Sequence, residues 1–178
     1  GLDAVLDEKV DISPDFSTSW TPKDRVSSYH RSRQYVLESA LVWITDLVDG
    51  YRAAIMRMPG LLPDSTITRI NRLDGRANKL RELAKSLDME PSDSELLIRA
   101  AYSWRNRVVH SSNSSERVSA DLRARLLEAT DRIHANYRGL DIEQYISNVE
   151  GTSAPTFKET ASTIAAAQQL VELIDASV

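Results

Sequence analysis

Apolar residues follow a heptad pattern along the first third of the chain. They recur at alternating spacings of four and three residues, at Leu37, Leu41, Ile44, Val48, Tyr51, Ile55 and Met58. This spacing places them on one face of a helix. Thr21-Pro22 is typical of a helix start, with threonine as the cap and proline at the first helical position. We therefore expect one helix from about residue 22 to residue 58.

Three more long helices are predicted by the pattern that follows. Apolar residues at helical spacing between Ile70 and Leu87 predict a second helix from about residue 64 to residue 88, in spite of Gly75 within it. Ser92 and Glu95 fit a capping box and predict the start of a third helix, which continues through Val108. A fourth helix carries an apolar stripe from Leu122 to Tyr137 and ends at Arg138-Gly139, where glycine can take the left-handed closing conformation.

The two ends of the chain differ in pattern. Residues 141–149 predict a short helix, and Thr156 with Glu159 forms a second capping box before a final helix that reaches almost to the C-terminus. Residues 1–20 show no sustained apolar period and predict an extended N-terminal arm.

We expect an all-α fold, an up-and-down bundle of five main helices plus one short helix, formed as a single domain by residues 21–178.

Composition agrees with this fold and narrows the chemistry. The chain has 178 residues, only 6% aromatics, and six glycines and six prolines, which favours helices over a turn-rich β architecture. The net charge of −4 argues against a general polyanion binder, but 17 of the 22 basic residues are arginine. The planar fork of arginine suits bidentate contacts with phosphate, so a local basic site remains open.

Several classes of chemistry are disfavoured. The chain has no cysteine, which excludes disulfides, thiolate metal sites and a cysteine nucleophile. Three scattered histidines give no ligand cluster, so we expect neither a metal nor another cofactor. No apolar run approaches the length of a membrane span, and we expect a soluble, cytoplasmic protein without membrane contact.

The most informative stretch closes the third predicted helix, at Arg105-Asn106-Arg107-Val108-Val109-His110. The spacing alone is weak evidence, because Arg25 and His30 reproduce it elsewhere. A histidine at a helix C-terminus is also favoured by the helix dipole, and Arg105 has the alternative role of a surface ion-pair residue. A helical projection puts Arg99, Tyr102, Asn106 and His110 opposite the apolar stripe of Leu97, Ala101, Trp104 and Val108. We therefore expect these polar side chains to face water or a partner.

The motif Arg105-Asn106-x-x-x-His110, closing an amphipathic helix inside an all-helical protein, resembles the signature of the HEPN superfamily. In that family an arginine, usually followed by a polar residue, lies four to six residues before a histidine. The resemblance implies metal-independent endoribonuclease activity at a composite site on a homodimer interface. It also implies an RNA substrate, and a toxin-like or antiviral role that an antitoxin or other regulatory partner restrains.

The residue chemistry is compatible with that implication. Imidazole changes its protonation state near neutral pH, so His110 can exchange a proton with a ribose 2′-hydroxyl or a leaving oxygen. Arg105 can hold the scissile phosphate, and Asn106, one turn before His110, can orient the imidazole or contact the phosphate. Arg99, Tyr102 and Arg107 are the candidate RNA contacts. Two motifs facing across a twofold axis would let arginine and histidine come from different chains.

Two other readings of the chain stay open. In the first, a non-catalytic HEPN-like module uses the same helix face for dimerisation, or to bind RNA or another protein. In the second, the chain is a structural bundle whose long first helix associates with a partner.

Overall fold

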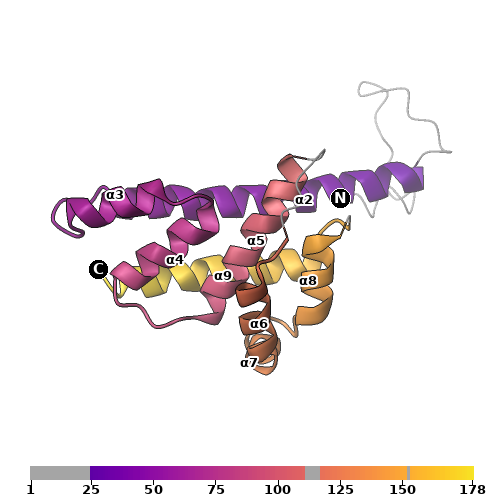
Figure 1. Cartoon of the computed structure of the whole chain (residues 1–178). Coiled ribbons are helices and arrows are strands. Elements are labelled where there is room, and N and C mark those ends of the chain that lie inside the picture. Colours follow the sequence, from indigo (N-terminus) through magenta and orange to yellow (C-terminus); the bar gives the residue numbers. More distant parts are fainter. Residues whose placement is uncertain (1–24, 111–116, 152) are drawn as a thin grey trace, which may run out of the picture.

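The computed structural model describes residues 25–110, 117–151 and 153–178, and this part of the chain is all-helical (Figure 1). Its eight helices are α2 (Arg25–Ile55), α3 (Asp64–Arg72), α4 (Arg76–Ser86), α5 (Asp93–Val109), α6 (Ala120–Glu128), α7 (Thr130–Asn136), α8 (Ile142–Glu150) and α9 (Phe157–Asp175). The predicted N-terminal arm, the predicted helix start at Thr21-Pro22 and the polar segment after His110 lie outside the described residues.

The predicted first, third, short and final helices correspond to α2, α5, α8 and α9. The predicted second helix is wrong as a single element, since it is divided into α3 and α4. Gly75 lies between them at φ 75° and ψ 144°, a conformation that continues no helix and that glycine adopts most easily. The predicted fourth helix is divided into α6 and α7 at Ala129, whose φ of −88° and ψ of 4° depart from α-helical values. Local backbone conformation therefore interrupts two continuous apolar stripes.

The two predicted capping boxes have different outcomes. In α9 both halves are present: the Thr156 side chain accepts from the Glu159 N–H, and the Glu159 carboxylate accepts from the Thr156 N–H. In α5 the Ser92 hydroxyl accepts from the Glu95 N–H at 3.1 Å. The Glu95 carboxylate, however, forms an ion pair with Arg99, so we describe this end as a serine cap.

Helix α5 lies at the centre of the fold, where it packs against α2, α4, α6, α8 and α9. Every residue from Ser94 to Tyr102 is buried, which means that the first turns of α5 are covered on all sides. Trp104 is fully buried and meets the ring of Tyr145 from α8 edge-on, with ring centroids 5.5 Å apart. The core is built around this helix.

Helices α2 and α9 run beside each other and leave part of α2 uncovered (Figure 1). Leu41, Val48 and Ile55, from the predicted heptad stripe, are buried. Trp43 and Leu47, which lie on a neighbouring face of the same helix, are 69% and 57% exposed. Among the described residues, no helix combines the length and the apolarity needed to cross a membrane.

Candidate functional site

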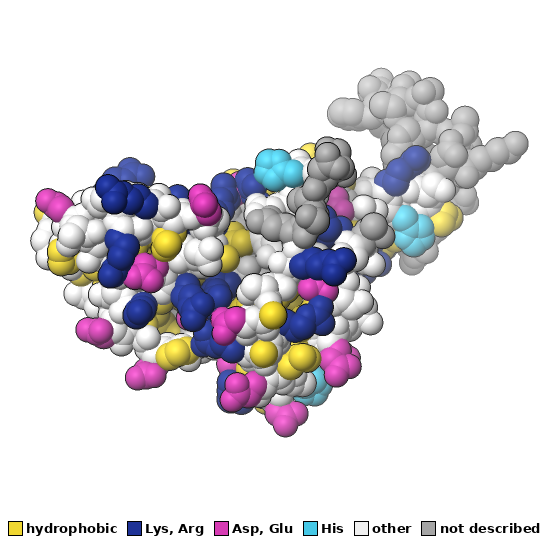
Figure 2. All heavy atoms as spheres, viewed as in Figure 1, with side chains coloured by type: hydrophobic (Ala, Val, Ile, Leu, Met, Phe, Trp, Pro, Cys, Tyr) yellow, Lys and Arg dark blue, Asp and Glu magenta, His cyan; other side chains and the backbone are white. Residues whose placement is uncertain are grey.

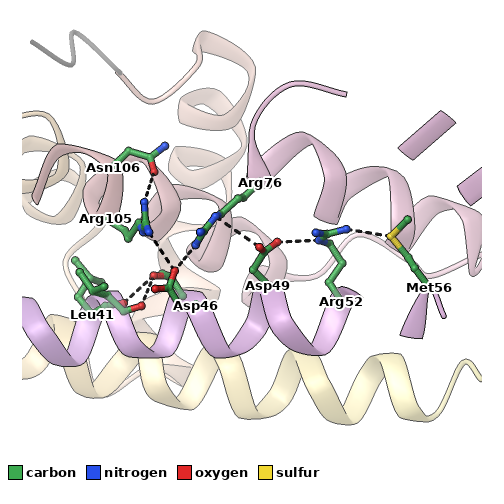
Figure 3. Close-up of polar contacts among 10 residues, drawn as sticks. Leu41, Asp46, Asp49, Arg52, Met56, Arg76, Arg105 and Asn106 are labelled. Atoms are coloured by element: carbon green, nitrogen blue, oxygen red, sulfur yellow. Dashed lines mark hydrogen bonds and ion pairs between the residues drawn. The ribbon is translucent and has the colours of Figure 1, made fainter. Parts of the chain in front are cut away.

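Arg105 lies in the last turns of α5 and is held by two oxygen acceptors (Figure 3). One guanidinium nitrogen is 3.4 Å from the Oδ1 atom of Asp46 on α2, and the other donates to the Oδ1 atom of Asn106 at 3.4 Å. The Arg105 side chain is 14% exposed, and its Nε is buried without a hydrogen-bond partner. The sequence gives the position of Arg105 on the helix, whereas its pairing with Asp46 is a result of folding.

Asp46 belongs to a chain of charged groups between α2, α4 and α5 (Figure 3). Arg76, in the first turn of α4, pairs with Asp46 and lies 3.6 Å from Asp49, which in turn accepts from Arg52 at 2.9 Å. Three arginines against two aspartates leave this network one positive charge. The network therefore has the charge sign that a phosphate ligand requires.

The pKa of Asp46 reflects these neighbours. Burial raises it, but the hydrogen bond from Arg76 and the positive charges of Arg105 and Arg76 outweigh burial, so the pKa lies below its ordinary value. Asp46 is thereby kept ionised beside Arg105. The sequence reasoning did not identify Asp46 or the role of Arg76, because the only signal was a charged residue within an apolar helix pattern.

Asn106 and His110 lie one turn apart at the end of α5. His110 is the C-terminal cap residue, and its backbone N–H donates to the Asn106 carbonyl at 2.9 Å. The His110 side chain is exposed and Asn106 is half-buried. The predicted outward direction is confirmed for His110. No contact joins Arg105 and His110 among the described interactions, as the separation expected on one helix would suggest.

The predicted outward exposure of Arg99 and Tyr102 is wrong. Their side chains are 3% and 1% exposed, and Arg99 forms a buried ion pair with Glu95, with the two atoms 3.3 Å apart. The helical projection assumed one covered face of α5, but α4 and α6 cover the opposite face as well. Neither side chain has the surface exposure on which its assignment as an RNA contact depended.

Arg107, the third candidate RNA contact, has a different set of partners. Its guanidinium donates to the carbonyl oxygens of Asn148, Val149 and Ser153 at 3.0 to 3.1 Å. Two of these carbonyls belong to the last turn of α8, where such groups lack helical partners. Burial lowers the pKa of Arg107, and Glu38 opposes that shift. This arginine ties the end of α8 to α5.

Other basic side chains gather between α4 and α6. In Figure 2, lysine and arginine side chains lie near the centre of the face in view. Arg81 and Lys85 of α4 and Arg125 of α6 line one hollow in this region, together with Asp88 and Glu95. Within the described part of the chain, no three carboxylate or imidazole side chains come together as metal ligands would.

No protein family, curated protein or solved structure matches this chain at a significant level. The functional assignment therefore depends on the motif in α5 and on the chemistry of the groups around it.

Proposed function

We propose that this chain is a metal-independent endoribonuclease of HEPN-like fold, whose site forms where two copies of the chain meet. The observation that carries the proposal is the arrangement at the end of α5. Arg105 is oriented by Asp46 and Asn106, and His110 is exposed one turn beyond Asn106. Such an oriented cation and an accessible imidazole are the two groups that cleavage through a ribose 2′-hydroxyl needs.

The proposed reaction uses these groups in one displacement. The neutral imidazole of His110 takes the proton of the 2′-hydroxyl, and the resulting oxygen attacks the adjacent phosphorus. The bond from phosphorus to the 5′-oxygen breaks, and that oxygen takes a proton from water, which leaves a 2′,3′-cyclic phosphate. The imidazolium of His110 then releases its proton to the solvent and returns to the neutral form. Arg105 stabilises the negative charge that grows on the phosphate oxygens. Asn106 keeps Arg105 in place and lies one turn from His110.

A second copy of the chain is proposed because α2 offers it an apolar surface next to Arg105. A hollow of about 520 Å³ is lined by Trp43, Leu47 and Tyr51, and Asp46 lines it as well. Asp46 thus joins the exposed apolar surface to the network around Arg105. Exposed large apolar side chains that cluster in this way are typical of interaction surfaces. Burial of this face by a second copy would bring two Arg105 networks close together.

The central experiment is cleavage of single-stranded RNA by the purified protein in EDTA. We expect products that end in a 2′,3′-cyclic phosphate, and a loss of at least about 100-fold in rate for Arg105→Ala and for His110→Ala, since each removes a group acting in the transition state. His30→Ala is the matched control, because His30 is also an exposed histidine of the same spacing pattern, and its rate should equal that of the wild type. RNA that stays intact with the wild-type dimer would refute the proposal.

Mixing the two inactive variants tests the composite site. If one chain supplies arginine and the other histidine, a dimer of Arg105→Ala with His110→Ala keeps one complete site. Random exchange of subunits should then restore about a quarter of the wild-type rate. Restoration well below this level, with exchange verified by mass spectrometry, would place both groups of each site on one chain.

A second candidate is a non-catalytic module that binds RNA or protein through the end of α5. It is favoured by the ion pair itself, since Asp46 occupies one side of the Arg105 guanidinium. Binding of RNA without cleavage, lost in Arg105→Ala, would support it. A toxin-like or antiviral role, with a restraining partner, extends the enzyme proposal only. Growth arrest on expression should then disappear with His110→Ala.

A further inference from the structure

A second site with unsatisfied polar groups lies closer to the start of α5 than the Arg105 network does. A pocket of about 270 Å³ opens between the start of α4, the residues that precede α6, and α5. Helix α5 contributes Arg99, Tyr102, Ser103 and Asn106, which share one face of the helix. The projection from the sequence grouped three of these residues correctly, but the face that they share borders a pocket enclosed by other elements.

Two residues in the wall of this pocket each carry a buried group that makes no hydrogen bond. The Nε of Arg99 and the hydroxyl of Tyr102 are both buried without a partner, in side chains that are 3% and 1% exposed. Buried polar groups in folded proteins are nearly always hydrogen-bonded, since an unpaired one keeps its full desolvation cost. Two such groups on neighbouring turns of one helix, both in the same wall, indicate a place for a polar ligand.

The start of α4 adds hydrogen-bond donors to the same pocket. Gly75, Ala77 and Asn78 line it, and the first N–H groups of a helix have no partner within the helix. No side chain caps this end, and the first turn of α4 contains no acidic residue. The positive end of the α4 dipole therefore borders the pocket, and no carboxylate of the first turn of α4 balances it.

The charges in the wall favour an anion. Arg76, Arg99 and Arg117 line the pocket, and Asp74 is the acidic residue among the lining side chains. Arg76 is already paired with Asp46 and Asp49, and Arg99 with Glu95, so the charge that no described ion pair balances is that of Arg117. Burial lowers the pKa of Arg99, Glu95 raises it, and the nearby Arg81 and Arg125 lower it further. A bound anion would offset the desolvation of the Arg99 charge and weaken this repulsion.

We propose that this pocket binds a phosphate monoester, with the phosphoryl group at the start of α4 and beside Arg99 and Tyr102. Arginine forks, a hydroxyl donor and helix N–H groups together suit the oxygens of a phosphate. The pocket volume of about 270 Å³ lies near the lower end of the roughly 300 to 1,000 Å³ found for ligand pockets, which suits a phosphoryl group with a small organic part. The proposal does not depend on ribonuclease activity, although Asn106 borders both sites.

Isothermal titration calorimetry tests the proposal with inorganic phosphate, ribose 5-phosphate, ribose and a 5′-phosphorylated trinucleotide. We expect ribose 5-phosphate to bind and ribose not to bind. If the trinucleotide binds more tightly than ribose 5-phosphate, the source of the phosphate is an RNA end; if it binds more weakly, the source is a small molecule. Equal heats for ribose and its phosphate, or no binding of any phosphate probe, would overturn the proposal.

Two mild variants separate ligand binding from folding. Tyr102→Phe removes the unpaired hydroxyl. It should weaken the binding of ribose 5-phosphate about tenfold, because hydrogen bonds to charged groups are strong. Its stability without ligand should not fall, whereas Tyr137→Phe, which loses a bond to Gln169, should be less stable. Arg117→Gln should also weaken binding, and Arg57→Gln, an exposed arginine outside the pocket lining, should not. Unchanged affinity in both Tyr102→Phe and Arg117→Gln would place the ligand elsewhere and refute the site.

Discussion

The two ends of α5 differ in how deeply their side chains are buried, although they belong to one helix with one hydrophobic pattern. From Ser94 to Tyr102 every side chain is buried, including the charged pair Glu95 and Arg99. From Arg105 onward the side chains are half-buried or exposed, and His110 is open to solvent. In the first part of the helix, polar groups must satisfy one another or a ligand. In the last part they can meet a substrate or a second chain.

This contrast explains where the helical projection succeeded. A projection sorts residues by direction around the helix, and it correctly placed Arg99, Tyr102 and Asn106 on a shared face. It carries no information on what lies opposite that face. Helices α4 and α6 pack against α5, and residues from both line the pocket beside Arg99 and Tyr102, whereas Val109 and His110 at the end of α5 are exposed. Direction is a local property of the helix, whereas exposure depends on the rest of the fold.

The largest effect that would test the contrast is expected in the buried half. Glu95→Gln removes the negative charge beside Arg99 and leaves a buried cation without a partner. We expect a loss of about 3 kcal/mol in the free energy of unfolding, as for other broken buried pairs. Urea denaturation measures this loss. His110→Ala, at the open end, should stay within about 0.5 kcal/mol of the wild type. A similar small effect for both variants would contradict the contrast.

A smaller effect is expected for Arg107, at the boundary between the two parts. Arg107→Lys replaces a fork that reaches three carbonyl oxygens by a single amine, so at least one carbonyl of the α8 end loses its donor. The expected loss is about 1 kcal/mol in the free energy of unfolding. Arg57→Lys, at an exposed position, is the matched control and should leave the stability unchanged. If Arg107→Lys unfolds at the same urea concentration as the control, the carbonyl contacts contribute nothing to stability.

The smallest effect concerns Asp46, which is 45% exposed. Its pKa is lower in the folded chain than in the unfolded chain, so its stabilisation is complete above its ordinary value of 3.8 and is lost as the pH falls through the lower folded value. Asp46→Asn should cost less than about 1 kcal/mol at pH 7, because solvent screens a pair at this exposure. The difference from the wild type should shrink in acid below pH 3.8, which urea titrations at pH 7 and pH 3 would show. If Asp46→Asn loses the same amount of stability at both pH values, the ion pairs of Asp46 are not the cause of that loss.

Much of the helical layout could be predicted from the sequence. The start of α5 at Ser92, the capping box of α9 and the long α2 follow from residue types at fixed local spacings, because helix caps and apolar periods act within a few residues. The breaks at Gly75 and Ala129 were missed because the apolar period continues across them and only the backbone angles change. The position of a helix boundary depends on the conformation of a single residue. An apolar stripe is recognised from many residues together, so it does not reveal where one helix ends and the next begins.

The sequence by itself determined that Arg105, Asn106 and His110 lie within the last two turns of one helix, since that requires only the helical repeat. Only the tertiary structure decided that Asp46, 59 positions earlier, pairs with Arg105, and that Arg99 and Tyr102 are buried beside a pocket. These outcomes depend on which helices pack around α5, and such packing joins residues far apart in the chain. Charge pairing and burial at the site are therefore properties of the assembled fold.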